Sequence, residues 1–164
     1  MIVGDGAERK ALEADVRART LLAGRTVFIG ETSDTVSQLN SFDVFVLPSL
    51  AEGMSNALLE AMSVGVACVA TRVGGNSELV EEVLSRLLFE AGDAKALADH
   101  LQSLALNPQR RKELGGNARK RVEDGFSLRR MLSNYRNLYE DAIGSRRTEP
   151  VLLNYVPSAR TWHE

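Results

Sequence analysis

The chain has few of the residues that build disulfide frameworks and metal sites: one cysteine and two histidines among 164 residues. A single cysteine excludes an internal disulfide framework and fits a reducing compartment, so we expect a cytoplasmic location. His100 and His163 lie far apart without ligand-like neighbours, and we expect no metal site. Cys68 lies inside an apolar run, which predicts a buried, unreactive thiol.

The chain also lacks a charge excess and a long apolar run. Its formal net charge is −2, which gives no reason to expect nucleic acid or an anionic membrane as a partner. No stretch approaches the length of a membrane span, and no basic segment leads into an apolar one at the N-terminus. An apolar content of 44% and a charged content of 26% are ordinary for a globular domain, and the length suits one domain.

What the sequence does contain is an alternation of strand and helix patterns. Short apolar runs predict strands at 1–3, 27–30, 44–47, 66–71 and 86–89. Helix patterns lie between them at 8–22, 34–40, 57–62 and 78–83, the first with Leu12, Val16, Ala18 and Leu22 as inward positions. Three further helices are expected: one at 94–106 capped by Asp93, one at 108–122 opened by Pro108, and one ending at 143 that Ser127 caps. This order predicts an α/β fold, a Rossmann-like doubly wound parallel sheet with a helical C-terminal segment.

The most informative segment is the strand–loop–helix that carries Glu52 and Glu60. Pro48 and Gly53 mark the loop after the strand at 44–47, and Ser55 or Asn56 can cap the helix that follows. One carboxylate then lies in the loop and the other about one turn inside the helix. Fully helical spacing would place them at most ~12 Å apart.

The backbone N–H groups of residues 54–57 lie between these two carboxylates. They are at the positive end of the helix and have no partner within it. Such a surface binds an anion at its centre and offers acceptors for hydroxyl groups on either side. A sugar–diphosphate–ribose has this order of hydroxyls, negative charge and hydroxyls.

This arrangement resembles the E-x7-E motif of the retaining glycosyltransferases of the GT-B fold, family 4. The likeness runs from Asp43 through L-P-S, E-G and Gly65 to the segment V-G-G-N-S-E at 73–78. Residues 3–6 look like the second strand of the family's C-terminal domain. Its closing helices are matched by Arg119, Phe126, Ser127, Tyr135 and Tyr139.

The resemblance covers 1–144 and implies a partial nucleotide-sugar-binding domain that lacks its first strand. Residues 145–164 form a tail of unknown role, which includes the apolar segment 151–156. The tail is expected to be disordered or to dock on the domain or on a neighbouring chain.

The resemblance also implies a role for each matching residue. Glu52 would be catalytic, holding sugar hydroxyls near the anomeric carbon, and Glu60 would accept hydrogen bonds from the ribose. The remaining donor-binding residues are Gly53, Met54, Ser55, Asn56, Asp5, Gly6, Gly30, Glu31 and Gly75. For Asp5, Gly6, Gly30, Glu31 and Gly75, ordinary turn positions remain an equal alternative.

In the family, such a site transfers a glycosyl group from a nucleotide-sugar to an acceptor hydroxyl, with retention and without a metal or other cofactor. Cell-surface polysaccharide or glycan synthesis is the expected pathway. The arginine and lysine that stabilise the diphosphate precede the matching region, as does the acceptor-binding N-terminal domain. We therefore expect this chain alone to bind donor weakly and to transfer nothing.

The missing first strand would lie in the middle of the sheet, between the strands at 1–3 and 44–47. Strand rearrangement, the segment 151–156 or a partner chain is expected to fill this space, the last through homo-oligomerisation or strand exchange. A non-catalytic binding or association module and a nucleotide-sugar 2-epimerase are the alternative functions. The basic residues of 110–130 predict an ordinary solvated face.

Overall fold

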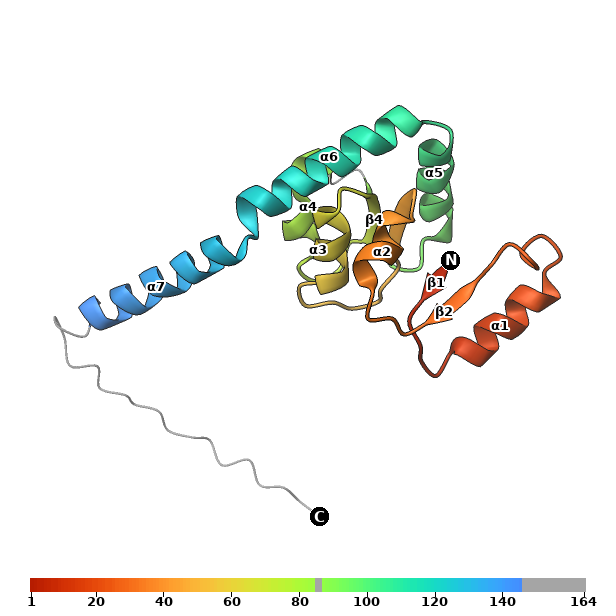
Figure 1. Cartoon of the computed structure of the whole chain (residues 1–164), viewed down its shortest axis with the longest axis horizontal. Helices are drawn as coiled ribbons and strands as arrows, with labels where there is room; N and C mark the ends of the chain where they lie inside the picture. Colours follow the sequence, from red (N-terminus) through yellow and green to blue (C-terminus); the bar gives the residue numbers. More distant parts are fainter. Residues whose placement is uncertain (85–86, 146–164) are drawn as a thin grey trace, which may run out of the picture. The chain divides into compact units, whose positions relative to one another are not determined.

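The computed structural model describes residues 1–84 and 87–145, and the side chains of all of these except 81–84 and 145. The strands are β1 Ile2–Val3, β2 Phe28–Gly30, β3 Val44–Leu47, β4 Ala67–Thr71 and β5 Leu88–Phe89. The helices are α1 Arg9–Ala18, α2 Thr35–Asn40, α3 Asn56–Ser63, α4 Asn76–Leu84, α5 Ala94–Ala105, α6 Pro108–Gly125 and α7 Leu128–Ser145. They form two compact units, Met1–Val122 and Glu123–Glu164, which we describe separately (Figure 1).

The strands of the first unit form two parallel sheets. β1 pairs with β2, and β3, β4 and β5 form a second sheet in that order. The described strands therefore leave an interruption between β1 and β3, where the sequence predicts the missing strand. Among the described residues, no strand occupies this position, so the structure does not show the strand rearrangement that was one of the three expected ways to fill it. The segment 151–156 lies outside the described residues, and filling by a partner chain stays a prediction.

The hydrophobic core lies around the β3–β5 sheet. Val69 of β4 packs with Phe89 of β5 and Leu104 of α5, and a second cluster joins Leu39 to Ala61 and Val66. All of these side chains are buried, whereas no residue before Gly30 is buried. The predicted α/β fold class is confirmed, and the apolar contacts that stabilise it are concentrated on one of its two sheets.

Side-chain caps fix the starts of three helices, and those at Ser55 and Asp93 are among the caps predicted from the sequence. The side chains of Asp34, Ser55 and Asp93 accept hydrogen bonds from backbone N–H groups three residues later, at 3.2, 3.3 and 2.9 Å. Each bond satisfies a donor that the first helical turn leaves without a partner.

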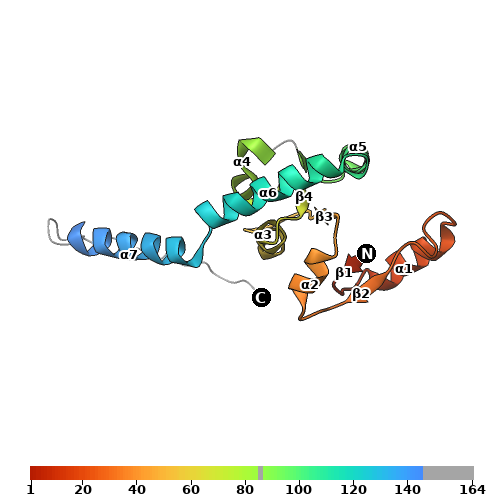
Figure 2. The same cartoon turned by 45° about the horizontal axis from the view of Figure 1, so that its top comes forward.

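The first helix differs from its prediction. The pattern predicted a helix over 8–22, but α1 ends at Ala18 and contains no buried residue. Leu12 and Leu22 are 47% and 40% exposed, so their predicted inward placement was wrong. An apolar stripe is buried only where a packed surface lies opposite it. The elements drawn beside α1 are the two short strands β1 and β2 (Figures 1 and 2).

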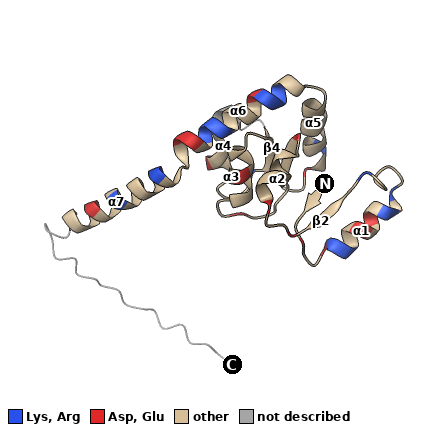
Figure 3. Ribbon diagram, in the orientation of Figure 1, with Lys and Arg blue, Asp and Glu red and all other residues tan. Residues whose placement is uncertain are grey.

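Helix α6 packs closely against the turn between α3 and β4. A Cβ atom built on Gly115 would collide with the carbonyl oxygen of Gly65. Arg111 bonds to Asp43 and to the Leu104 carbonyl, and Arg121 bonds to the carbonyls of Glu78 and Leu79. The prediction of a solvated basic face is therefore corrected for Arg111 and Arg121, which join α6 to the rest of the first unit. Figure 3 shows the Lys and Arg positions along α6 in blue.

The second unit is built on helix α7. The backbone N–H of Arg130 bonds to the Ser127 side chain at 3.3 Å, which confirms the predicted cap. The rings of Tyr135 and Tyr139 stack with centroids 6.4 Å apart. Within the described part of the chain, none of the helices has the length and apolar character needed to cross a membrane.

Candidate functional site

The candidate site begins where β3 ends and α3 starts. The loop 48–55 connects them, and Ser55 caps α3 by accepting the N–H of Leu58. The helix starts at Asn56, so the N–H groups of Asn56 and Ala57 belong to its first turn, which cannot pair them internally. A helix therefore begins where the sequence predicts the anion-binding amides.

Glu52 is fixed within this loop. It is half-buried, and its Oε1 accepts a hydrogen bond from the Ser49 hydroxyl at 2.6 Å. The carbonyl of Ser49 in turn accepts a hydrogen bond from the Thr71 hydroxyl at 2.7 Å. Thr71 is the last residue of β4 and is 1% exposed. The loop that carries the first carboxylate is thus attached to the end of the neighbouring strand.

The glycine loop before α4 packs directly on the acidic loop. The N–H of Gly75 donates to the Gly53 carbonyl at 2.6 Å. A Cβ atom on Gly75 would lie 2.8 Å from that oxygen, and one on Gly74 would collide with the Glu52 carbonyl. Gly74 also has a φ of +50°, which disfavours other residues. Glycine is required here because two backbones touch.

Asn76 is a buried residue that connects the start of α4 to the end of β4. It is fully buried, and its Nδ2 donates to the Thr71 carbonyl at 3.0 Å. Its Oδ1 has no hydrogen-bond partner among the described residues. The side chain of Asn76 holds the start of α4 against the end of β4, so both loops share one anchoring strand.

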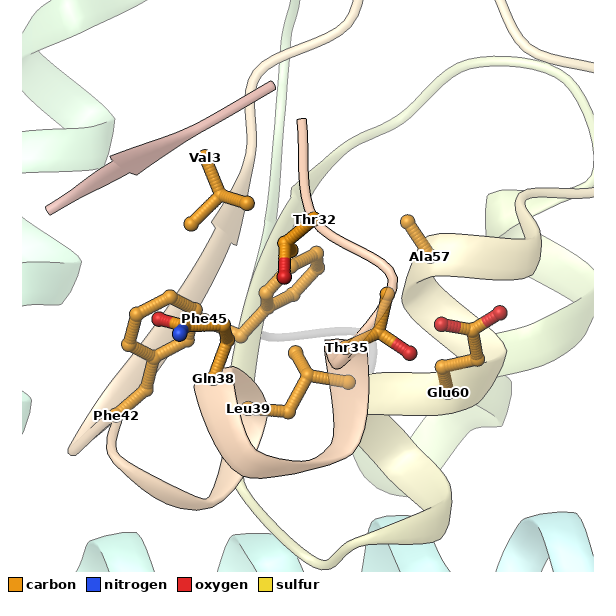
Figure 4. A pocket seen from close by; sticks show the side chains of 9 residues that line it. All are labelled: Val3, Thr32, Thr35, Gln38, Leu39, Phe42, Phe45, Ala57 and Glu60. Atoms are coloured by element: carbon orange, nitrogen blue, oxygen red, sulfur yellow. The ribbon is translucent and has the colours of Figure 1, made fainter. Parts of the chain in front are cut away.

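Glu60 lies on α3, one turn after the helix start, beside a pocket of about 150 Å³. Figure 4 shows Glu60 and Ala57 along α3 on one side and the aromatic rings of Phe42 and Phe45 on the other. The pocket is also lined by Val3, Thr32, Thr35, Gln38 and Leu39. Glu60 is exposed, so its carboxylate can accept hydrogen bonds from a ligand.

The remaining predicted residues gather at the ends of β1 and β2. The N–H of Gly4 bonds to the Gly30 carbonyl at 2.7 Å, which brings Asp5 close to Gly30. The Gly6 N–H and, next, the Arg9 guanidinium at 2.9 Å bond to the Asp5 carboxylate and lower its pKa. A carboxylate already paired in this way is less available to a ligand, and Arg9 was not predicted from the sequence.

The structure therefore brings the predicted residues into two groups. In the first group, Gly53 contacts Gly75, and Glu52 and Gly53 precede Met54, Ser55 and Asn56 in the same loop. In the second group, Asp5, Gly6, Gly30 and Glu31 lie at the ends of the other sheet. The pocket at Glu60 links the groups through Val3 and Thr32. Sequence reasoning missed the roles of Ser49, Thr71 and Asn76, since no local pattern indicates contacts between separate loops.

Comparison with known proteins identifies the family to which the chain belongs. Residues 1–107 match the family described as glycosyl transferases group 1. The chain is 31% identical over 143 residues to N-acetyl-alpha-D-glucosaminyl L-malate synthase of Bacillus anthracis, and 31% identical over 143 residues to UDP-Gal:alpha-D-GlcNAc-diphosphoundecaprenol alpha-1,3-galactosyltransferase of Escherichia coli. Each match covers 87% of this chain and 37% of the relative.

A solved structure shares the architecture described above. Sucrose-phosphate synthase from Thermosynechococcus elongatus superposes with a TM-score of 0.76 at 29% identity, over 87% of this chain and 38% of that one. The chain thus spans less than half the length of these relatives, and its fold is that of the C-terminal half of a GT-B enzyme. By sequence and by fold, the chain belongs to the glycosyl transferases group 1 family.

Proposed function

We propose that this chain binds the nucleotide-diphosphate-sugar donor of a glycosyltransferase that acts with retention at the anomeric carbon. The observation that carries the proposal is the start of α3 at Asn56, with Glu52 before it and Glu60 one turn inside it. The amides at this helix start would meet the diphosphate, because N–H groups and the helix dipole favour an anion there.

The two carboxylates would divide the uncharged parts of the donor between them. Glu60 would accept the ribose hydroxyls from its place beside the pocket, and Glu52 would accept sugar hydroxyls close to the reacting carbon. Negative charge at Glu52 would also stabilise the positive charge that develops at the anomeric carbon in the transition state. The relative from Escherichia coli, whose name specifies UDP-Gal, makes a UDP-sugar the first donor to test.

The acceptor, the transfer step and the pathway concern the whole enzyme. We propose an acceptor hydroxyl held by a separate N-terminal domain, in cell-surface polysaccharide or glycan synthesis in the cytoplasm. The relative named for a diphosphoundecaprenol-linked acceptor supports this assignment. The function that we propose for the present chain is donor binding. We propose that the isolated chain binds the donor weakly and does not catalyse transfer.

A binding experiment on the 164-residue chain tests the donor site. Amide shifts in ¹H–¹⁵N spectra would be followed during titration with UDP, UDP-GlcNAc, UDP-Gal and GDP-mannose to millimolar concentrations. We expect the largest changes at residues 54–57. Glu60→Gln should weaken every ligand that binds by about tenfold, whereas Glu52→Gln should weaken only the sugar-bearing ones, as expected for lost hydrogen bonds to a charged group.

Glu113→Gln is the matched control. Glu113 lies on α6 and accepts a hydrogen bond from Gln109, so the change removes one carboxylate that is not part of the proposed donor site. This variant should bind like the unmodified chain. Shift changes that avoid residues 54–57, or equal binding by Glu60→Gln, would contradict the proposed donor site.

A further inference from the structure

Ser49 makes a direct side-chain contact with the Glu52 carboxylate. The hydroxyl group of Ser49 donates to Oε1 of Glu52 at 2.6 Å, three residues along the same loop. Both side chains are half-buried. A short hydrogen bond to a charged acceptor is stronger than one between neutral groups, so it can select one side-chain conformation of glutamate.

The position of Ser49 is itself fixed from outside the loop. Its carbonyl accepts the hydroxyl of Thr71 at 2.7 Å, and Thr71 is buried at the end of β4. The neighbouring contact between Gly75 and Gly53 holds the other side of Glu52. The backbone on both sides of Glu52 is therefore attached to the β4–α4 connection, and Ser49 completes this support at the side chain.

The bond from Ser49 leaves Glu52 able to bind a ligand. An ionised carboxylate has about four acceptor positions on its two oxygens, and Ser49 occupies one of them on Oε1. The other positions remain for the hydroxyl groups of a sugar. Fixing the acceptor in advance reduces the entropy lost when a ligand binds.

We propose that Ser49 is a positioning residue that orients the Glu52 carboxylate toward the sugar of the donor, with Thr71 holding Ser49 in place. The inference rests on the proposed function for its ligand, but its geometric part concerns the free chain. It assigns Ser49 to sugar discrimination and not to nucleotide binding, which Glu60 provides.

The first arm of the test needs no ligand. Three-bond NMR couplings across χ1 of Glu52 would be measured in the isotope-labelled 164-residue chain. One rotamer should dominate in the unmodified chain, Ser49→Ala should give averaged couplings, and Ser49→Thr should restore them because it keeps the hydroxyl. Averaged couplings in the unmodified chain, or unchanged couplings in Ser49→Ala, would overturn the inference.

Two further variants guard against indirect effects. Ser41→Ala removes a serine hydroxyl that makes a 2.7 Å bond to the Gln38 carbonyl, far from Glu52 in the sequence, and it should change nothing at Glu52. If Ser49→Ala does not fold, Ser49→Cys takes its place, since a thiol has similar shape and is a weaker donor. Thermal unfolding of each variant identifies those that are folded.

The second arm measures the ratio of the Kd values for UDP and UDP-GlcNAc. Ser49→Ala should lower the preference for UDP-GlcNAc by about tenfold, as Glu52→Gln does, while leaving the affinity for UDP unchanged. If Glu52→Gln loses the preference for UDP-GlcNAc but Ser49→Ala keeps it, the inference about Ser49 is overturned, while the proposed role of Glu52 stands. A preference kept in Glu52→Gln would overturn the proposed role of Glu52 as well, so the two failures are distinguishable.

Discussion

At the scale of single residues, the two glutamates of the motif are held in different ways. Glu52 is half-buried and bonded to Ser49, whereas Glu60 is exposed at the edge of a largely apolar pocket. The sequence was sufficient to place both on a strand–loop–helix and to narrow the helix cap to Ser55 or Asn56, because these depend on local spacing. It could not predict the bond from Thr71 to Ser49, whose partners are 22 residues apart.

Cys68 provides a test of burial at this scale. The residue is half-buried, less than the sequence predicted; its thiol donates to the Val66 carbonyl at 3.3 Å, and burial of the thiol raises its pKa from an ordinary 9.0 to about 12. Below pH 9 the thiol is protonated in both folded and unfolded chains. Between pH 9 and 12 the unfolded chain ionises first, so it binds fewer protons than the folded chain and stability falls as pH rises.

Urea denaturation of the unmodified chain and of Cys68→Ala measures this effect. The difference in free energy of unfolding between the two should shrink by about 1–2 kcal/mol from pH 9 to pH 10.5, since one pKa unit corresponds to about 1.4 kcal/mol. Taking the difference cancels the titration of lysines and tyrosines common to both. A constant difference would show that the folded thiol ionises like an exposed one.

At the scale of elements, sequence patterns located most of the helices and strands but not all of their ends. The start of α3 follows from its cap, whereas the pattern over 8–22 extends past the end of α1 at Ala18. A side-chain cap can be predicted from the sequence, because the capping residue and the N–H group that it accepts are only three residues apart. The end of an amphipathic helix depends on how much surface it packs against, which the sequence of the helix does not contain.

The contact between α6 and the α3–β4 turn predicts opposite effects for two adjacent glycines. A Cβ atom at Gly115 would meet the Gly65 carbonyl, whereas one at Gly116 would have no atom within 4 Å. Gly115→Ala should therefore destabilise the chain by about 1–3 kcal/mol through overpacking. Gly116→Ala should stabilise it by up to about 1 kcal/mol, because alanine favours helix more than glycine does.

Chemical denaturation followed by circular dichroism measures both variants under the same conditions. Each replaces glycine with alanine in one helix, so the difference between them isolates the close approach to Gly65. Equal stabilities for the two variants would mean that α6 does not pack on this turn in solution.

At the scale of the whole molecule, the interruption between the two sheets lies where the sequence predicted the missing strand, and we expect the two sheets to differ in stability. The family's strand order placed the missing strand between β1 and β3, and the described strands leave that position open. The sequence could not show how the apolar contacts divide. The structure places every buried apolar side chain at or beyond Leu39, while Ile2, Val3 and Ile29 are 37–39% exposed.

Native-state hydrogen exchange should therefore resolve two levels of protection in the first unit. The amides of Ile2 and Gly4 bond to the carbonyls of Val27 and Gly30 at 2.8 and 2.7 Å, but few buried contacts oppose their opening. Amides of β4, in the middle of its sheet, can open only when the core around Val69 unfolds. We expect the β1–β2 amides to exchange at least about 100-fold faster, since local opening costs less than global unfolding.

The dependence of these rates on denaturant separates the two kinds of opening. Exchange in β4 should accelerate steeply with low concentrations of urea, because global unfolding exposes much surface, whereas exchange in β1 and β2 should scarcely change. Equal protection and equal slopes would mean that the two sheets unfold as one unit. The β1–β2 pair would then need a stabilising contact beyond the described residues, and the space beside β3 would be the first place to look for it.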